Sequence, residues 1–410
     1  MVKVAVFGYG TVGSGVVEVI EKNKEQVSKK AGEGIEVAYI LDLREFPGDP
    51  YEAKVVHDVN VILEDPEVKI VCETMGGTTF AYNYTKAALE RGKSVCTSNK
   101  EMVAKFGPEM LELAREHGCN YLFEASVGGG IPIIRPLNDC LTAEKVEAIT
   151  GILNGTTNYI LTKMEREGAD FDKVLARAQE KGYAERNPEA DIEGHDACRK
   201  IAILSSLMMG KNVDFEKIPT EGITKIVPAD FEYAKAAGRT IKLLARAKMI
   251  DENTLEAMVS PVMLDKENPL AMVSMVFNAI LVKGNMLGEA MFYGKGAGKL
   301  ATASAVVGDV IDCVRHLGKQ IPCFWDAEDA TILDAGKHSY AYYVRAKKNA
   351  KEALEAVLPG GEFIELPERT EDLAYFTQPM SHNAFERYVR ALVIWCLEAF
   401  ALVNARRASR

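Results

Sequence analysis

Short apolar runs alternate with helical stretches over the first 135 or so residues. The runs are VKVAVFG, EVAYILDL, KIVCET, SVCTSN and NYLFEA. Between them, the segment from Thr11 to about Lys30 carries its valines and isoleucine on one helical stripe, and FAYNYTKAALERGK and PEMLELAREHG are also helical. Strands that alternate with helices at this spacing predict an α/β Rossmann domain with a doubly wound parallel sheet.

The pattern changes from about Ile131. VEAITGILNG predicts a strand, followed by helices around 157–168, 171–182 and 194–209. LEAMVSPVML and MVSMVFNAILVKGN predict strands of a second sheet, so we expect an α+β domain that extends to about residue 295. A glycine-rich turn at 294–298 then precedes a long apolar helix, ATASAVVGDVIDCVRHL.

The last 70 residues predict a smaller α+β unit. YAYYVRA is expected to be a strand, AKEALEAVL a helix, and EFIEL and LAYFTQ two more strands, before an amphipathic stretch that begins near Ser381. The sequence therefore divides into a nucleotide-binding region (1–133 with about 296–318), a second domain (134–295) and a C-terminal unit (338–410).

Composition narrows the classes of function. Hydrophobic residues make up 48% and charged residues 26% of the 410 residues, which excludes a disordered chain. The net charge of −10 offers no global basic field for nucleic acid or an anionic membrane, and no apolar stretch nears the length of a membrane span. Small anionic substrates stay possible, because an acidic protein can carry a local cationic pocket.

The eight cysteines are scattered singly, without C-x-x-C spacing, and no H-E-x-x-H occurs. A thiolate zinc site or a disulfide framework is therefore not expected. Isolated thiols suit a reducing cytosol, and the N-terminus enters a strand directly, without a signal-peptide pattern. We expect a cytoplasmic protein.

The segment GYGTVG at residues 8–13 lies between a strand and a helix, as the dinucleotide fingerprint requires. Glycines allow the tight turn and the close approach of a pyrophosphate to the amides at the helix N-terminus. The residues expected to contact a cofactor here are Gly8, Gly10, Thr11, Val12 and Gly13.

Two residues after the second strand point to different cofactors. Asp42 suits the ribose diol of NAD, while Arg44 suits the 2′-phosphate of NADP or is an ordinary surface arginine. Residues 73–79, ETMGGTT, and Ser98 with Lys100 follow the next strands. Ligands of such sheets bind beyond the carboxyl ends of the strands, so these segments are expected beside the nicotinamide.

A polar cluster follows the first strand of the second domain. NGTTNY at 154–159 joins this strand to a helix, where Thr156 or Thr157 could simply be the N-cap. The polar residues that follow within 18 positions are Tyr183, Glu185, Asp191, Asp196 and Lys200. Asp196 and Lys200 share a helix face, either as a surface ion pair or as a lysine that relays a proton for an alcohol. The remaining carboxylates suit the ammonium group of an amino-acid substrate.

Five segments in order together resemble homoserine dehydrogenase: TSNKE, EASVGGGIP, GILNGTTNYIL, DIEGHDACRK and GKGAGKLATASAVVGD. The resemblance covers nearly all of residues 1–318. It implies reversible oxidation of L-homoserine to L-aspartate 4-semialdehyde with NAD or NADP, on the route to threonine and methionine. It implies Lys200 as the proton-transfer lysine, Lys100 as a second lysine near nicotinamide and substrate, and a substrate pocket. The pocket residues are Thr156 or Thr157, Tyr183, Glu185, Asp191 and Asp196.

The resemblance also implies a monovalent cation, usually sodium, and a dimer formed through the second domain. The cation ligands would be Glu124 and the backbone carbonyls of Val127, Gly129 and Ile131; from the residues alone, VGGGIP reads as a flexible hinge. Gly296 and Gly298 match a second cofactor-contacting turn.

The C-terminus departs from the family pattern. Many relatives end in an ACT regulatory domain whose first strand runs into an Asp-x-Pro-Gly turn, whereas YYVRAKKNAKEAL has no Pro-Gly there. The C-terminal unit is expected to be a degenerate or shortened ACT-like domain, or a support for folding and oligomerisation without threonine sensing.

Three other functions compete. A phosphorylating aspartate-semialdehyde dehydrogenase needs a nucleophilic cysteine, and none lies in a recognisable reactive setting. A reductase of another amino-acid precursor would share the first domain but not NGTTNYIL. A regulatory protein that binds NADP without turnover would not need the two lysines, and both are present.

Overall fold

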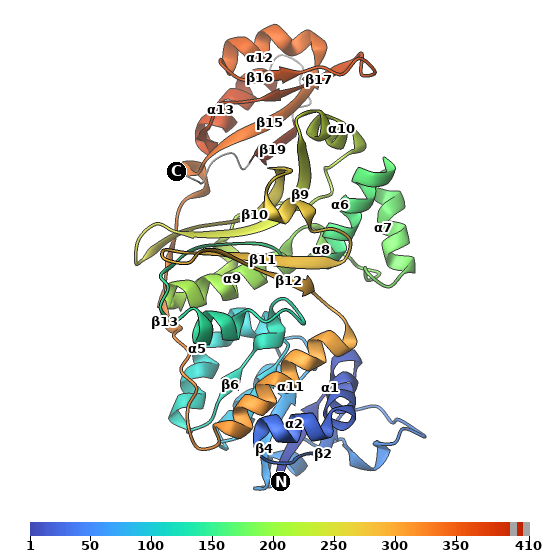
Figure 1. Ribbon diagram of the computed structural model, residues 1–410, viewed down its shortest axis with the longest axis vertical. Coiled ribbons are helices and arrows are strands. Elements are labelled where there is room, and N and C mark those ends of the chain that lie inside the picture. Colours follow the sequence, from blue (N-terminus) through green and yellow to red (C-terminus); the bar gives the residue numbers. More distant parts are fainter. Residues whose placement is uncertain (394–399, 405–410) are drawn as a thin grey trace. The chain divides into compact units, whose positions relative to one another are not determined.

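The computed structural model describes residues 1–393 and 400–404 (Figure 1). The chain forms two compact units, which are described one at a time. Unit 1 contains Met1–Val146, Ala202–Phe215 and Gly284–Ala330, and unit 2 contains Glu147–Ile201, Glu216–Lys283 and Thr331–Arg410.

Unit 1 is built on a parallel sheet with the strand order β3-β2-β1-β4-β5-β6. The strands are β1 (Val2–Phe7), β2 (Ile35–Leu41), β3 (Val55–Val56), β4 (Val68–Glu73), β5 (Ser94–Thr97) and β6 (Tyr121–Leu122). This is the order of a dinucleotide-binding Rossmann sheet, so the predicted fold class is confirmed. The sequence order reverses between β1 and β4, which creates the crevice at the carboxyl ends where such sheets bind ligands.

The helices of unit 1 are α1 (Thr11–Lys22), α2 (Lys24–Ala31), α3 (Asn60–Leu63), α4 (Phe80–Leu89), α5 (Lys100–Glu116) and α11 (Lys299–Arg315). The single helix expected over residues 11–30 is two helices that meet at Asn23, which has φ −106° and ψ 23°. Asparagine competes with helical hydrogen bonding through its own side chain, which favours an end there.

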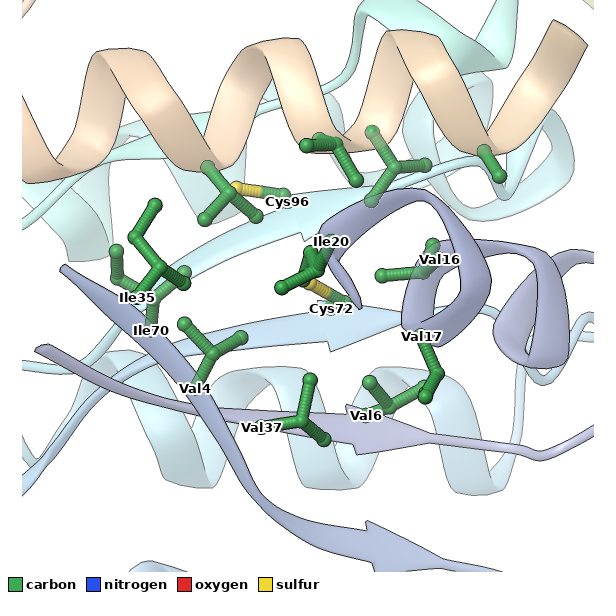
Figure 2. Packing of buried hydrophobic residues seen from close by; sticks show 14 of the residues in the cluster. Val4, Val6, Val16, Val17, Ile20, Ile35, Val37, Ile70, Cys72 and Cys96 are labelled. Atoms are coloured by element: carbon green, nitrogen blue, oxygen red, sulfur yellow. The ribbon is translucent and has the colours of Figure 1, made fainter. Parts of the chain in front are cut away.

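Helices α1 and α11 cover one face of the parallel sheet (Figure 2). Val16 and Ile20 of α1 and Val306 and Val310 of α11 are fully buried against the sheet valines and isoleucines. The helices pack closely because a Cβ on Gly15 would lie 2.9 Å from the Lys299 carbonyl oxygen. Complete burial stabilises each of these side chains by roughly 1.5–3 kcal/mol.

Unit 2 contains a second sheet with the order β11-β7-β9-β10-β19-β15-β17-β16. Its first strands are β7 (Val146–Ile152), β9 (Arg239–Met249), β10 (Thr254–Asp265) and β11 (Phe277–Gly284), and β9 pairs with β10 antiparallel along its whole length. Its helices are α6 (Gly155–Glu167), α7 (Phe171–Glu180), α8 (Glu189–Ile192), α9 (His195–Met209, which continues into unit 1) and α10 (Pro228–Ala236). The three helices predicted between 157 and 209 are confirmed to within a few residues.

The C-terminal segment has the element order β-α-β-β-α-β. The elements are β15 (Ser339–Lys347), α12 (Lys351–Val357), β16 (Glu362–Ile364), β17 (Asp372–Phe376), α13 (His382–Val393) and β19 (Phe400–Asn404). The strand order β19-β15-β17-β16, antiparallel throughout, is that of a ferredoxin-like sheet, to which ACT domains belong. The ACT-like expectation is confirmed at the level of fold. Residues 394–399 and 405–410 of the predicted unit lie outside the described residues.

The remaining short elements are strands β8 (Lys211–Asn212), β12 (Gly288–Lys295), β13 (Asp326–Asp329), β14 (Thr331–Ile332) and β18 (Met380–Ser381), with short 3-10 or π turns between the main elements. Within residues 1–393 and 400–404, no helix has both the length and the apolar character needed to cross a bilayer.

Candidate active site

The loop between β1 and α1 has the shape that a pyrophosphate needs. Gly8 has φ +88°, and a Cβ on Gly13 would lie only 1.9 Å from the Gly8 carbonyl oxygen. Gly10 is the N-cap of α1 and has no side chain to occupy the amides of the first turn, which begins with Thr11 and Val12. These amides at a helix N-terminus form a ready anion site.

Asp42 and Arg44 interact directly at the end of β2. Arg44 donates from Nε to Oδ1 of Asp42 (2.9 Å) and from Nη2 to Oδ2 (2.8 Å), and the Tyr9 amide also donates to Oδ2 (2.8 Å). The guanidinium beside it holds the pKa of Asp42 well below its usual range. The Asp42 side chain is 9% exposed and that of Arg44 is 62% exposed. The arginine therefore presents its charge to solvent, while the Asp42 carboxylate already accepts hydrogen bonds from Arg44 and Tyr9.

The carboxyl ends of β4 and β5 are joined by a buried carboxyl group. Glu73 accepts hydrogen bonds from the Thr97 hydroxyl (2.6 Å) and the Met75 amide (2.8 Å), and burial raises its pKa. Asn99 caps α5 by accepting from the Met102 amide and donates to the Gly77 carbonyl (2.7 Å). These bonds fix the two loops that the sequence placed beside the nicotinamide.

Two predicted residues, Ser98 and Lys100, follow β5 at this edge of the sheet. The Ser98 amide donates to the Glu73 carbonyl (3.3 Å), and Lys100 is the half-buried first residue of α5. Glu73 was expected here only as part of the segment ETMGGTT, and its structural role was not predicted. Its signal was an acidic residue at the end of an otherwise apolar strand.

The second glycine turn packs against the VGGGIP segment. Gly298 is the N-cap of α11 with φ +129°, and a Cβ on Gly129 would lie 2.4 Å from the Gly296 carbonyl oxygen. A Cβ on Gly130 would lie 2.9 Å from that of Ala301. In this structure the glycines therefore serve close packing of two backbone segments.

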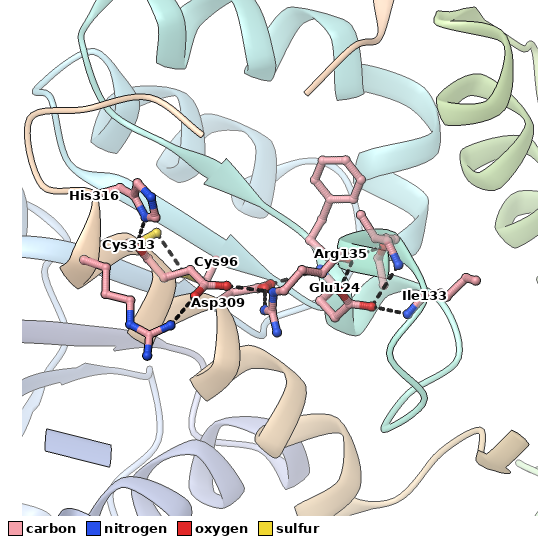
Figure 3. A network of polar contacts seen from close by, with 12 residues as sticks. Cys96, Glu124, Ile133, Arg135, Asp309, Cys313 and His316 are labelled. Carbon is pink, nitrogen blue, oxygen red and sulfur yellow. Dashed lines mark hydrogen bonds and ion pairs between the residues drawn. The ribbon is translucent and has the colours of Figure 1, made fainter. Parts of the chain in front are cut away.

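The Glu124 carboxylate accepts hydrogen bonds from the backbone segment that follows VGGGIP (Figure 3). Its Oε1 accepts the amides of Ile133 (2.6 Å) and Ile134 (2.9 Å), and its Oε2 accepts the amide of Arg135 (2.7 Å). Three of the roughly four acceptor positions of the carboxylate thus hold the segment that follows VGGGIP, and its role as a cation ligand stays a prediction.

The carbonyl oxygens of Val127, Gly129 and Ile131 differ from the Glu124 carboxylate in their hydrogen bonding. No hydrogen bond in the described part of the chain engages them. They keep their capacity to bind a hard cation, and a cation site formed by these carbonyls stays a prediction.

Asp309 of α11 anchors the same network. Its Oδ2 accepts from the Glu124 amide (2.9 Å) and its Oδ1 from Nη2 of Arg135 (2.7 Å), while Nε of Arg135 lies 2.7 Å from Asp312. Burial, and then the neighbouring Glu124 charge, raise the pKa of Asp309 to about 8.

In unit 2, Lys200 lies in a small buried polar cluster. Its Nζ donates to Oδ2 of Asp196 (2.7 Å) and to the Leu153 carbonyl (2.8 Å). Lys200 and Asp196 are 8% and 4% exposed, so this is no surface ion pair. Asn154 donates its amide hydrogens to Asp191 (2.7 Å) and to the same oxygen of Asp196 (2.8 Å).

Asn154 is the residue that sequence reasoning named only as part of a motif. It is the N-cap of α6, where its Oδ1 accepts from the Thr157 amide (2.9 Å). The expected alternative that Thr156 or Thr157 caps the helix is wrong. The signal was the asparagine immediately before the glycine at the strand–helix junction.

Of the other predicted pocket residues, Thr156 and Tyr183 contact each other, whereas Glu185 lies apart from the Lys200 cluster. The Thr156 hydroxyl donates to the Tyr183 carbonyl (2.6 Å), and the Tyr183 ring packs edge-on against Tyr159 with centroids 5.0 Å apart. Glu185 is exposed, and its backbone carbonyl accepts from Gln179 (2.9 Å). No described contact joins the Glu185 side chain to the Lys200 cluster.

Comparison with known proteins gives a consistent result. The family model described as "Homoserine dehydrogenase" matches residues 132–311, and the one described as "Homoserine dehydrogenase, NAD binding domain" matches residues 8–124. A homoserine dehydrogenase of Synechocystis sp. is 46% identical over 76% of this chain and 73% of its own length, and one of Bacillus subtilis is 40% identical over 77% and 73%.

Solved structures agree. A homoserine dehydrogenase from Thiobacillus denitrificans is 33% identical, with a TM-score of 0.90 over 98% of each chain. A hyperthermophilic archaeal homoserine dehydrogenase in complex with NADPH is 28% identical, with a TM-score of 0.66 over 79% of this chain and 99% of that one.

Proposed function

The chain belongs to the homoserine dehydrogenase family, and we propose that it interconverts L-homoserine and L-aspartate 4-semialdehyde with the Lys200 cluster as the proton-transfer and substrate-binding centre. The observation that carries these roles is the lysine held between a carboxylate and a carbonyl at 2.7 and 2.8 Å in a buried setting. A bound nicotinamide would supply the hydride acceptor for the carbinol carbon. The chain's own residues must supply the proton acceptor.

Lys200 is suited to that task because its ammonium group is fixed. Asp196 and the Leu153 carbonyl take two of its three hydrogens, which leaves one direction for a substrate oxygen. In the reductive direction Lys200 donates a proton to the aldehyde oxygen, and in the oxidative direction its neutral amine accepts the hydroxyl proton. A positioned acid–base group of this kind contributes roughly 10²–10⁴-fold to a rate.

Asp191 and Asp196 are proposed to receive the substrate ammonium. Asn154 binds both carboxylates with one amide group, so it sets the distance between them. The sensor function without turnover is not favoured, because the chain belongs to an enzyme family and carries both lysines. Glu185 and Lys100 keep their expected substrate and assisting roles as proposals.

We propose NADP as the preferred cofactor. The Asp42 oxygens already accept from Arg44 and Tyr9, so they are poorly placed to receive a ribose diol. The exposed guanidinium would form charge-assisted bonds with a 2′-phosphate, and the archaeal relative was solved with NADPH. The pyrophosphate would lie on the amides that follow Gly10.

Three further assignments are proposals. A monovalent cation would be held by the carbonyls of Val127, Gly129 and Ile131, with the Glu124 carboxylate holding the chain behind them. A homodimer or larger homo-oligomer follows from family resemblance and is checked by light scattering. Threonine sensing by the ACT-like segment is tested by the same assay as the reaction.

The experiment is absorbance-monitored reduction of NADP and NAD by L-homoserine, with and without L-threonine. We expect turnover with NADP in preference to NAD, and loss of most turnover in Lys200→Ala with retained cofactor binding. Lys163→Ala is the matched control, because Lys163 also pairs with an acid four residues away (Glu167, 2.7 Å) on a helix of unit 2. Equal activity in both variants would remove Lys200 from the mechanism.

A further inference from the structure

The loop at residues 273–277 contains an unusual backbone conformation. Met275 has φ +60°, and no other non-glycine residue in the described part of the chain has a positive φ. The left-handed region is disfavoured for a residue with a Cβ, so the surroundings must hold Met275 there. Such conformations gather at functional sites, where the surrounding contacts maintain them.

Helix α6 holds the loop along one stripe. The Asn158 amide donates to the carbonyls of Phe277 (3.0 Å) and Val273 (3.4 Å), and the Met275 amide donates to the Thr162 hydroxyl (3.0 Å). Thr162 in turn donates to the Asn158 carbonyl (2.6 Å). Residues 158 and 162 lie one helical turn apart, so they face the same way.

The stripe begins at the first residue of the helix. A Cβ on Gly155 would lie 2.9 Å from the Val276 carbonyl oxygen, so only glycine lets the loop approach the start of α6. On its other side the loop is tied to β9, because Nζ of the buried Lys242 donates to the Val273 carbonyl (2.7 Å). The loop therefore fixes where the N-terminus of α6 lies.

The N-terminus of α6 carries the groups that organise the reaction centre. Leu153 and Asn154 immediately precede Gly155, and they bind Lys200 and the two aspartates. A displacement of the helix start would move the carbonyl and the amide together. A shift of that kind changes both the direction of the lysine and the spacing of the carboxylates.

We propose that the 273–277 loop, with Met275 in the left-handed conformation and Asn158 as its clamp, positions the substrate cluster through the N-terminal turn of α6. Asn158 and Met275 are positioning residues, since neither contacts the reacting groups. The proposal deepens the proposed function and rests on it for its effect on turnover.

The test uses two substitutions at one position. Met275→Gly and Met275→Val both remove the methionine thioether and keep the amide that donates to Thr162. Glycine adopts a positive φ freely, whereas a β-branched residue resists it. We expect Met275→Gly to keep kcat/KM for L-homoserine within about twofold, and Met275→Val to lower it roughly 10- to 100-fold, as misplacement of a reacting group by about 1 Å does.

Two readouts separate positioning from a general loss of structure. The Kd for NADP should be unchanged in both variants, because the glycine loop belongs to unit 1. Hydrogen exchange of the amides in 154–160 should be faster than wild type in Met275→Val and not in Met275→Gly. Asn158→Ala should match the valine variant in both exchange and kcat/KM.

The outcomes are distinguishable. Equal kcat/KM and equal exchange in the glycine and valine variants would overturn the positioning role while wild-type turnover leaves the proposed function intact. Absence of wild-type turnover would overturn the proposed function, and the exchange comparison would still decide whether the loop fixes the start of α6.

Discussion

Substitution of Glu124 tests whether its carboxylate holds the chain or binds a cation. The structure gives this group three backbone donors, from Ile133, Ile134 and Arg135, at 2.6–2.9 Å in a site that is 3% exposed. A hydrogen bond to a charged group contributes about 1.5–3 kcal/mol, and such bonds on one group are not additive. We therefore expect Glu124→Ala to lower the free energy of unfolding of unit 1 by about 3–5 kcal/mol, in the range found when one partner of a buried charged pair is removed.

Glu124→Gln keeps an acceptor at only one of the two carboxylate oxygen positions. The amide oxygen can replace Oε1 and accept from Ile133 and Ile134, but the amide nitrogen would then face the Arg135 N–H, donor against donor. One lost bond and one unsatisfied buried donor cost about 1–3 kcal/mol. The glutamine variant should thus be destabilised by less than the alanine variant.

The assay is urea unfolding followed by fluorescence of Trp325. This tryptophan is buried in unit 1 with its ring centroid 6.0 Å from that of Phe123, next to Glu124 in the chain. A Trp395→Phe background removes the only other tryptophan. Glu112→Ala is the control, because that acid forms an exposed pair with Arg115 on α5 of the same unit and should change stability little.

All measurements are made in choline chloride and repeated in sodium chloride. A carboxylate that caps the chain predicts the same loss in both salts. If Glu124→Ala were as stable as wild type in choline and less stable only in sodium, the carboxylate would be a cation ligand, and the role argued from Figure 3 would be wrong.

Three further substitutions have expected outcomes. Arg44→Ala should lower kcat/KM for NADP roughly 10- to 100-fold and leave that for NAD within about threefold, because only the 2′-phosphate loses a charge-assisted bond; an equal loss with both cofactors would contradict this. Asn154→Ala should raise the KM for L-homoserine and lower kcat, since two aspartates and the α6 N-cap lose their common partner; steady-state kinetics that match wild type would make Asn154 dispensable. Burial lowers the pKa of Lys242 to about 8, so between about pH 8 and 10.5 the unfolded state binds more protons than the folded state. The free energy of unfolding of the wild type should therefore rise by about 3 kcal/mol across that window relative to that of Lys242→Met. Parallel pH profiles of the two proteins would show that Lys242 is not desolvated.

The fold was largely predictable because its signals are local. Strand–helix alternation and the glycine loop identified the Rossmann sheet, and α6, α7 and α9 begin within two residues of their expected positions, whereas α8 and α10 were not predicted. Strand β9 escaped notice because its apolar alternation is interrupted by Lys242 and Arg246. Burial of Lys242 depends on the Val273 carbonyl, which a reading of β9 alone does not contain.

In the candidate site, too, local contacts could be predicted and tertiary contacts could not. Asp196 and Lys200 are four residues apart on one helix, so their contact follows from helix geometry and could be predicted. Asn154 is 42 residues from Asp196, and only the tertiary fold brings the two side chains together. When the role of a residue depends on tertiary contacts, the sequence shows only its local role, which for Asn154 is that of the N-cap.

Glu124 illustrates why residue type alone does not assign a ligand. A carboxylate near several glycine carbonyls suits a hard cation chemically, and that was the expectation. The same carboxylate also suits a run of free amides, and Ile133 to Arg135 present three of them at the start of a helical turn. The chain after VGGGIP supplies these amides to Glu124, and within VGGGIP Gly129 packs closely against Gly296. The comparison of choline and sodium salts decides whether the carboxylate that holds this segment also binds a cation.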